Sequence, residues 1–412
     1  MKKVLRTVLA LGLGVFFLAT AFAGGGGQQA AAKTENKLII FQSKVEITAR
    51  LEEAAKAYKA ETGVEVEVWS TTGDDYFLQL RNRLANNQGP DLFNLRTDAE
   101  ISQMANYLED IGDLSVASDI SPDLLGKSGG KIVGIPYTVE AFGFIYNKSL
   151  IDPSKITDYN SFAAAMKNMK AKGVNGLGLS QEAYFLIGHI LNTPFAIQKD
   201  VPGFLDKLNK GEVKMADTAE FKEFARFMIA IRDNSYNPLE VNYDRQCGDF
   251  ATGKTAAIHQ GNWCFPMFSD YNIKFQMAFM PFPLFGNDKL AVGVPSWWCV
   301  NSQTSGSKKK LAKDFIEWLY SSETGKKFLY DEFQFIPVVK GASSAKLDPL
   351  ALDVSRFTAS GKIIPWAFNF WPAGIIEVHL APVAQQFFSS GMKAEEFLAA
   401  LDKAWADANK RK

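Results

Sequence analysis

The chain has 412 residues, and its 45 lysines and arginines balance 45 aspartates and glutamates, so the formal net charge is +0. This length exceeds one small core and predicts two or three domains. Apolar residues make up 47% and charged residues 22%, a globular composition that argues against disorder. A neutral chain with three histidines is not expected to bind nucleic acid, because phosphate binding needs a basic surface.

The first 23 residues have the pattern of a secretory signal peptide. Three basic residues precede an apolar run over residues 8–20, and Ala21-Phe22-Ala23 places small side chains at a cleavage site. A retained membrane anchor is the alternative, but the run is short for a spanning helix. No cysteine follows the run, so lipid attachment is not expected. We therefore expect cleavage after Ala23 and a periplasmic protein.

Cysteine usage argues against a metal centre. Export permits disulfides, but only Cys247, Cys264 and Cys299 are present, so at most one bridge can form, with three possible pairings. Neither a C-x-x-C motif nor the Cys/His spacing of a zinc site occurs. Free cysteines are most often small buried side chains. No metal and no cofactor are expected.

Regular structure is expected from residue 38, after a Gly- and Gln-rich tether over residues 24–36. The apolar run Leu38–Phe41 is typical of a strand covered on both faces. Apolar spacing at i, i+3, i+4 and i+7 predicts a helix over 48–61. The next expected elements are a strand, a helix and a strand over 64–69, 77–84 and 91–95. This alternation indicates a parallel sheet with crossovers, an α/β fold.

The pattern continues to the end of the chain. Residues 132–146 are apolar and interrupted by Gly134, Pro136 and Gly143, which predicts two extended segments joined by a bend. Apolar stripes predict four more helices, around residues 162–169, 221–231, 311–319 and 397–405. No repeat of the length typical of solenoids is found.

The sequence offers little support for an enzyme. It has no HExxH or GxGxxG motif, and neither a nucleophile elbow nor a P-loop is expected, so no catalytic residue is predicted. It carries instead carboxylates close to aromatic residues: Glu140 near Phe142, Glu182 near Tyr184, and tryptophans at 263, 297, 298 and 371. Such a set suits a carbohydrate, whose apolar ring face stacks on aromatic side chains and whose hydroxyls donate to carboxylates. The same paired acids would suit a glycosidase.

Two of these acids stand in unusual surroundings. Taken singly, a tryptophan is most often core and a glutamate most often surface. Glu140, however, lies inside the apolar segment 135–142, where a charge is costly unless it is paired or functional. Glu182 follows the apolar segment 176–179 at the expected end of a strand, where ligands of open α/β sheets bind.

Three segments resemble family 1 extracellular solute-binding proteins of ABC importers, the family of maltose-binding protein. Ile135–Leu150 (IPYTVEAFGFIYNKSL) is similar to the family's inter-lobe crossing, and Leu179–Phe185 (LSQEAYF) to a segment whose acid and ring contact sugar. Gly253–Trp263 (GKTAAIHQGNW) resembles the family signature GKxAM…GxW, whose tryptophan stacks on sugar. The resemblance extends over residues 37–408.

The resemblance implies a type II periplasmic-binding-protein fold of class α/β, with two lobes, each a sheet flanked by helices, and a ligand cleft between them. One lobe would comprise residues 37–139 and 297–340, the other 143–290 and 347–412. The implied function is that of a monomeric, non-enzymatic component of an ABC importer. It would bind an oligosaccharide by hinge closure and deliver it to a membrane permease. A secreted glycoside hydrolase and a ligand-presenting sensor without an import role are the alternatives.

The resemblance also implies ligand-binding residues. Those implied most directly are Glu140, Glu182, Tyr184 and Trp263, and further candidates are Lys44, Asp98, Trp297 (or its neighbour Trp298) and Trp371. The chain departs from the maltose binder at Leu95, where that protein has a stacking tryptophan, and at Ala99, which replaces an arginine. A sugar other than maltose is therefore expected.

Overall fold

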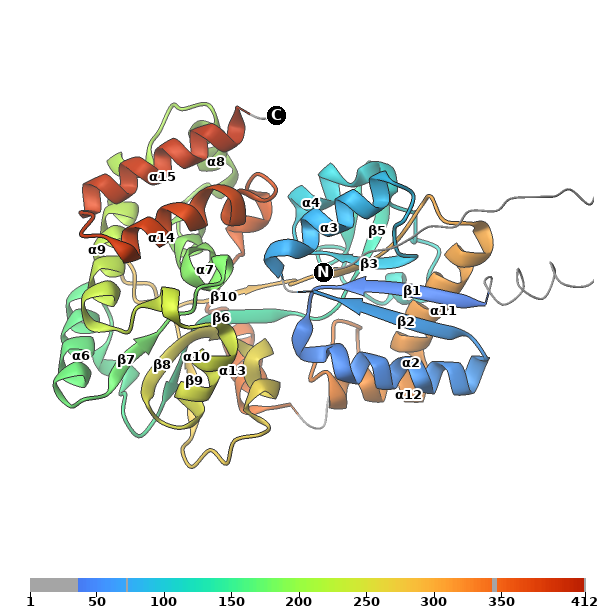
Figure 1. The fold of residues 1–412 in the computed structure, drawn as a ribbon, viewed down its shortest axis with the longest axis horizontal. Coiled ribbons are helices and arrows are strands. Elements are labelled where there is room, and N and C mark those ends of the chain that lie inside the picture. Colours follow the sequence, from blue (N-terminus) through green and yellow to red (C-terminus); the bar gives the residue numbers. More distant parts are fainter. Residues whose placement is uncertain (1–35, 72, 343–346, 411–412) are drawn as a thin grey trace, which may run out of the picture.

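A computed structural model describes residues 36–71, 73–342 and 347–410. The predicted signal peptide, and all of the predicted tether except Asn36, lie outside the described residues. The described chain forms two lobes that lie side by side, each built on one sheet (Figure 1). None of the described helices combines the length and the apolar character needed to cross a bilayer.

The first lobe is built on a sheet with strand order β2-β1-β3-β11-β5-β4. The strands are β1 (Lys37–Gln42), β2 (Glu65–Ser70), β3 (Leu92–Leu95), β4 (Gly126–Ser128), β5 (Lys131–Pro136) and β11 (Trp297–Val300). β1 runs parallel to β2 and β3, as the alternation predicted. β11 is antiparallel to β3 and β5, so the sheet is mixed. In the chain, β11 follows most of the strands of the other lobe, and it joins this sheet in the direction opposite to that of β3.

Helices cover both faces of this sheet (Figure 1). They are α2 (Thr48–Thr62), α3 (Gly73–Ala85), α4 (Asp98–Gln103), α5 (Ser115–Ser118), α11 (Gly306–Ser321) and α12 (Glu323–Lys327). α2 is the helix expected over 48–61. Its buried residues are Leu51, Ala54, Ala55 and Tyr58, the predicted apolar stripe. It ends at Gly63, whose φ of 76° places it in the left-handed conformation that favours glycine.

The second lobe has the strand order β12-β10-β6-β8-β7, and β9 also pairs with β6. Its strands are β6 (Glu140–Asn147), β7 (Asn175–Gly178), β8 (Thr255–Gly261), β9 (Met277–Met280), β10 (Leu290–Gly293) and β12 (Ile363–Ile364). Its helices are α6 (Tyr159–Ala171), α7 (His189–Ala196), α8 (Val201–Asn209), α9 (Ala219–Asn234), α10 (Tyr243–Ala251), α13 (Pro349–Ala359), α14 (Ala381–Ser389) and α15 (Ala394–Asn409).

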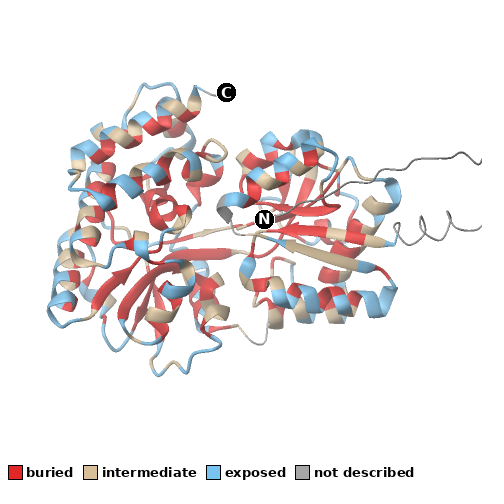
Figure 2. Ribbon diagram, in the orientation of Figure 1, coloured by how far each residue is buried: buried red, intermediate tan, exposed pale blue. Residues whose placement is uncertain are grey.

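Buried residues concentrate on the strands and on the inward faces of the helices (Figure 2). All eight residues of β6 are buried, because β6 pairs with β8, β9 and β10 and is covered on both faces. A glycine is needed at position 143, since a Cβ there would lie 2.8 Å from the carbonyl oxygen of Met280. The predicted pair of extended segments over 132–146 is confirmed as β5 and β6.

Two chain segments among the described residues connect the lobes. The first lies between β5 and β6 and the second between β10 and β11, and they are joined by a hydrogen bond from the Tyr137 amide to the Ser296 carbonyl (2.9 Å). Ile336 lies against the first of these segments: it bridges to Val139 and accepts a hydrogen bond from the Thr138 hydroxyl (3.0 Å). The crossings therefore run together between the two sheets.

Candidate functional site

A cavity of about 940 Å³ lies between the lobes. From the first lobe, Ser43, Lys44 and Glu46 line it just after β1, and Arg96 lines it just after β3. Because β1 and β3 are parallel, their carboxyl ends meet at the same edge of the sheet, where open α/β sheets bind ligands. The cavity therefore occupies the position that strand order alone would favour.

The second lobe lines the cavity with six aromatic side chains: Tyr184, Phe185, Tyr243, Trp263, Trp366 and Phe368. The rings of Phe185 and Trp263 are nearly parallel, with centroids 6.2 Å apart, and Trp263 meets Trp366 edge to face at 6.4 Å. Sequence reasoning identified Tyr184 and Trp263. It missed the others, although Phe185 belongs to the same LSQEAYF segment.

Trp263 is held by its own neighbours in the chain. It follows β8 directly, and its indole nitrogen donates a hydrogen bond to Gln260 Oε1 (2.9 Å). The indole ring folds back over Gly261, where a Cβ would lie only 2.1 Å from a ring carbon. The preceding Asn262 accepts a hydrogen bond from the Ala141 amide (2.9 Å) and so ties the turn to β6. The Gly-Asn-Trp order therefore has a steric and a hydrogen-bonding reason.

Lys44 forms a buried ion pair with Glu140. Its Nζ lies 2.8 Å from a carboxylate oxygen of Glu140 and 2.8 Å from one of Glu46. Burial disfavours the charged form of Lys44, but the two carboxylates outweigh this effect and hold its pKa above the ordinary value. Burial raises the pKa of Glu140, and Lys44 opposes that rise. Glu140 lines the cavity, and its charge is already matched by a partner in the protein.

Glu182 is differently placed. Its Oε1 accepts a hydrogen bond from the Tyr243 amide (2.9 Å), which fixes the carboxylate at the start of α10. Its Oε2 is buried and has no hydrogen-bond partner among the described residues, and the same holds for the Tyr243 hydroxyl. Unpartnered buried polar atoms are rare and costly. Both residues line the cavity, and a ligand with hydroxyl groups would satisfy these buried atoms once the side chains shift toward it.

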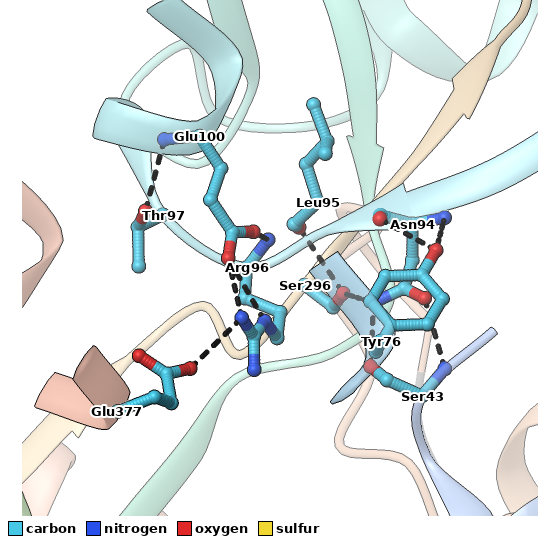
Figure 3. A network of polar contacts seen from close by, with 9 residues as sticks. All are labelled: Ser43, Tyr76, Asn94, Leu95, Arg96, Thr97, Glu100, Ser296 and Glu377. Atoms are coloured by element: carbon cyan, nitrogen blue, oxygen red, sulfur yellow. Dashed lines mark hydrogen bonds and ion pairs between the residues drawn. The ribbon is translucent and has the colours of Figure 1, made fainter. Parts of the chain in front are cut away.

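Arg96 links the two lobes (Figure 3). Its Nη2 lies 2.6 Å from Glu100 Oε1 in the first lobe and 3.1 Å from Glu377 Oε1 in the second. Its guanidinium also lies 5.5 Å from the ring centre of Tyr184. Burial disfavours its charge, but Glu100, Tyr184 and Glu377 keep the pKa well above the ordinary value. Its place directly after a parallel strand could have identified Arg96 from the sequence.

A second polar cluster fixes the wall after β1 (Figure 3). The Asn94 side chain accepts from the Ser43 amide (3.0 Å) and donates to the hydroxyls of Ser43 and Ser296. The Ser296 hydroxyl donates in turn to the Leu95 carbonyl (3.1 Å), and the Tyr76 hydroxyl accepts from the Asn94 amide (3.1 Å). β1, β3 and the second crossing therefore meet in one hydrogen-bonded unit beside the cavity.

Three predicted ligand-binding residues do not line the cavity. Asp98 is the first residue of α4, and burial raises its pKa. Trp297 is buried in the first lobe, where its indole nitrogen donates to the Leu124 carbonyl (2.7 Å); its neighbour Trp298 stacks on Tyr137 at 4.0 Å. Trp371 is 1% exposed and packs against core rings of the second lobe. Trp297 and Trp298 are neighbours in β11, and both are buried because the sheet of the first lobe is covered on both faces.

Two short patterns that match enzyme motifs lack the structure those motifs need. Residues 126–130 have the spacing GxSxG, but they form the hairpin between β4 and β5, not a strand-to-helix elbow. Residues 248–255 have the P-loop spacing, although no P-loop was expected from the sequence. They run from α10 through a turn into β8, whereas a P-loop runs from a strand into a helix.

The described chain contains no group of three or more His, Cys, Asp or Glu side chains that could hold a metal ion. Cys247, Cys264 and Cys299 are buried and free, in agreement with the role expected for small apolar side chains. Burial raises the pKa of the Cys264 thiol, and of Cys299 as well, so both stay protonated at neutral pH.

The chain belongs to the bacterial extracellular solute-binding protein family, whose model matches residues 53–351. A maltooligosaccharide ABC transporter solute-binding lipoprotein of Streptococcus pneumoniae is 25% identical over 311 residues, covering 71% of this chain and 70% of the relative. The melibiose/raffinose/stachyose-binding protein of Bacillus subtilis is 22% identical over 329 residues, covering 76% of each chain. The family resemblance found in the sequence is confirmed, and these relatives are named as binding proteins.

Solved structures confirm the predicted type II fold. The solute-binding protein RafE in complex with raffinose matches with a TM-score of 0.76 and 19% identity, covering 90% of this chain and 99% of that one. A chitin oligosaccharide binding protein matches with a TM-score of 0.74 and 21% identity, covering 91% and 99%. The likeness extends across both lobes, so the arrangement of the two sheets is that of the family.

Proposed function

We propose that this protein binds an oligosaccharide in the cavity between its lobes and delivers it to the permease of an ABC importer. One observation carries the proposal: six aromatic rings line the same cavity as Glu182, whose Oε2 has no partner among the described residues. Aromatic faces and orphaned acceptors together suit a ring compound that has an apolar face and hydroxyl donors. The volume of about 940 Å³ leaves room for more than one sugar ring.

The relatives support this choice of ligand. Their names specify maltooligosaccharides, the set melibiose, raffinose and stachyose, and galactooligosaccharides. All are sugars of two or more units, so raffinose, stachyose and maltotriose are the first ligands to test. Direct ligand contacts are proposed for Glu182, Tyr184 and Trp263. Lys44 and Glu140 are proposed to border the ligand as a preformed ion pair.

We propose hinge closure as the mechanism of binding. The rings belong to the second lobe, whereas Lys44, Glu46 and Arg96 belong to the first. A ligand that touches both walls binds the closed arrangement better than the open one, and this difference in affinity shifts the population toward closure. No bond in the sugar is broken. The hinge would lie at the crossings between lobes 37–139 with 297–340 and 143–290 with 347–412.

The proposal extends to the location of the protein. Removal of residues 1–23 after Ala23 would release it into the periplasm as a monomer without a lipid anchor. The mass of the mature protein purified from the exported fraction tests this step directly. A mass that includes the first 23 residues, or a lipid, would contradict it.

Ligand binding is tested by melting the mature protein with a panel of sugars. A ligand present at about 100 times its Kd should stabilise the folded protein by about 2.7 kcal/mol. Titration calorimetry then gives the affinity, and chromatography of the sugar after long incubation should recover it unchanged. Cleaved products would favour the glycoside hydrolase alternative, with Glu140 and Glu182 as its acid pair. No stabilisation by any sugar would overturn the proposed ligand class.

A further inference from the structure

Two buried histidines form a hydrogen-bonded chain next to the aromatic side chains that line the cavity. His189, the first residue of α7, lines the cavity, and its Nδ1 lies 3.2 Å from Nε2 of His259 in β8. Nδ1 of His259 lies 3.0 Å from the carbonyl oxygen of Gly143 in β6. His189 is 5% exposed and His259 is 0% exposed. Family motifs did not point to either residue.

The positions of the protons in this chain follow from elementary chemistry. A carbonyl oxygen can only accept a hydrogen bond. Nδ1 of His259 therefore carries a proton and donates a hydrogen bond to the Gly143 carbonyl. Nε2 of a neutral His259 then has no proton and must accept from Nδ1 of His189. Nδ1 of His189 is therefore the protonated nitrogen of a neutral ring. Its Nε2 is left as a free lone pair.

Both rings are neutral at pH 7. Burial lowers the pKa of His259 to about 4. Burial, and then the neighbouring His259, lower the pKa of His189 well below its ordinary value. Nδ1 of His189 faces His259, and no described residue forms a hydrogen bond with its Nε2. This nitrogen is also not among the buried polar atoms that lack a partner, which indicates that it faces the open cavity.

We infer that Nε2 of His189 accepts a hydrogen bond from one sugar hydroxyl and so determines which sugars the site selects. This inference rests on the proposed function and deepens it. The His189 ring stacks on the Phe142 ring, with centroids 4.2 Å apart. The ring centroids of Tyr184, Phe185 and Trp263 lie 5.4–5.7 Å from that of His189. A hydroxyl at this point is shielded from water, so a sugar without a donor there would leave the lone pair unsatisfied. Such a sugar should bind about 10- to 100-fold more weakly.

Two substitutions separate this role from a structural one. In His189→Asn, the amide nitrogen can replace Nδ1 as the donor to His259, but nothing replaces Nε2. In His189→Gln, the longer side chain can place its oxygen where Nε2 was, but it loses the bond to His259. With whichever of raffinose, stachyose or maltotriose binds the wild type, calorimetry should show at least a 10-fold loss of affinity for His189→Asn. His189→Gln should stay within a few-fold of the wild type.

The reverse order, with His189→Asn binding normally and His189→Gln binding weakly, would show that His189 only holds His259 and would overturn the inference. Melting of both empty variants verifies folding. A second measurement needs neither variants nor sugar. The chain has three histidines, so ¹⁵N-histidine NMR of the whole protein at pH 7 can assign each tautomer. Proton attachment to Nδ1 in His189 and His259 is expected, and a proton on Nε2 of His189 would overturn the inference.

The outcomes keep the two proposals apart. If the wild type binds a sugar and His189→Asn binds it equally well, the inference fails and the proposed function stands. If the wild type binds none of the three sugars and none of a wider panel, the proposed function fails, and the ligand role of His189 fails with it. In that case the NMR result still decides whether the derived proton arrangement is right.

Discussion

Arg96 and Glu377 are 281 residues apart in the chain, and they form a 3.1 Å ion pair across the two lobes (Figure 3). Each side chain is 12% exposed, so water screens the pair only in part. Arg96 is also bound to Glu100 within its own lobe, which holds the guanidinium in place before it meets Glu377. The pair therefore stabilises the arrangement of the lobes and not either lobe alone.

Glu377→Gln should weaken sugar binding without unfolding the protein. Arg96 keeps Glu100, so the loss is that of one partly screened ion pair, about 1 kcal/mol or a fivefold rise in Kd. Small-angle scattering of the empty variant should show a larger radius of gyration. Glu395→Gln, at an exposed acid on α15, is the matched control and should change neither quantity. If Glu377→Gln leaves both unchanged, the ion pair does not bias the lobes.

Trp263→Ala should lower sugar affinity by about 1–3 kcal/mol, the range measured when stacking aromatic rings are removed from other sites. The ring is half-buried, so the empty protein should lose only a little stability. Trp318→Ala is the control, because Trp318 is also half-buried and donates its indole hydrogen bond to Glu61 in the first lobe. It should cost stability and leave affinity intact. Equal affinities for both variants would remove Trp263 from the binding site.

The fold could be predicted because its signals are local. The apolar run of β1, the stripe of α2 and the bend between β5 and β6 each depend on a few neighbouring residues. The mixed character of the first sheet could not be predicted in the same way. It depends on β11 returning from the other lobe beside β3, a contact between residues some 200 positions apart.

The site was predicted mainly where a motif indicated it. Glu182, Tyr184 and Trp263 lie in short segments with a recognisable pattern, and all three line the cavity. Arg96 and His189 owe their roles to partners distant in the sequence. Trp297 and Trp371 show the opposite problem, because a tryptophan in a covered core has the same local pattern as one that faces a cavity.

Glu140 is expected to act mainly on stability, through Lys44. Glu140→Gln removes one of the two carboxylates that neutralise the buried ammonium, and Lys44→Met removes the ammonium itself. A double-mutant cycle on the free energy of unfolding of the empty protein should give a coupling of about 1–3 kcal/mol. The same cycle on Lys309 and Glu109, a 2.9 Å pair that is about one-quarter exposed, should give less than about 1 kcal/mol. A zero coupling for Lys44 and Glu140, together with a large loss of affinity for Glu140→Gln, would assign Glu140 to the ligand instead.

His259 should make the stability of the protein depend on pH. Its pKa in the folded state is about 4, against 6.5 for an ordinary histidine, so below pH 6.5 the unfolded chain takes up a proton that the folded chain refuses. The contribution of neutral His259 to the free energy of unfolding is complete above pH 6.5. It is lost as the pH falls to about 4, a change of about 3 kcal/mol. Asp348, whose pKa burial raises to about 6, titrates in the same range with the opposite sign.

The quantity to measure is therefore the difference between the wild type and His259→Asn, whose amide can still donate to Gly143 but has no proton to gain. Urea unfolding at several pH values between 7.5 and 4 should show the wild type losing about 3 kcal/mol more than the variant, because His189 and Asp348 are present in both proteins. Parallel curves would mean that His259 is not held neutral by burial.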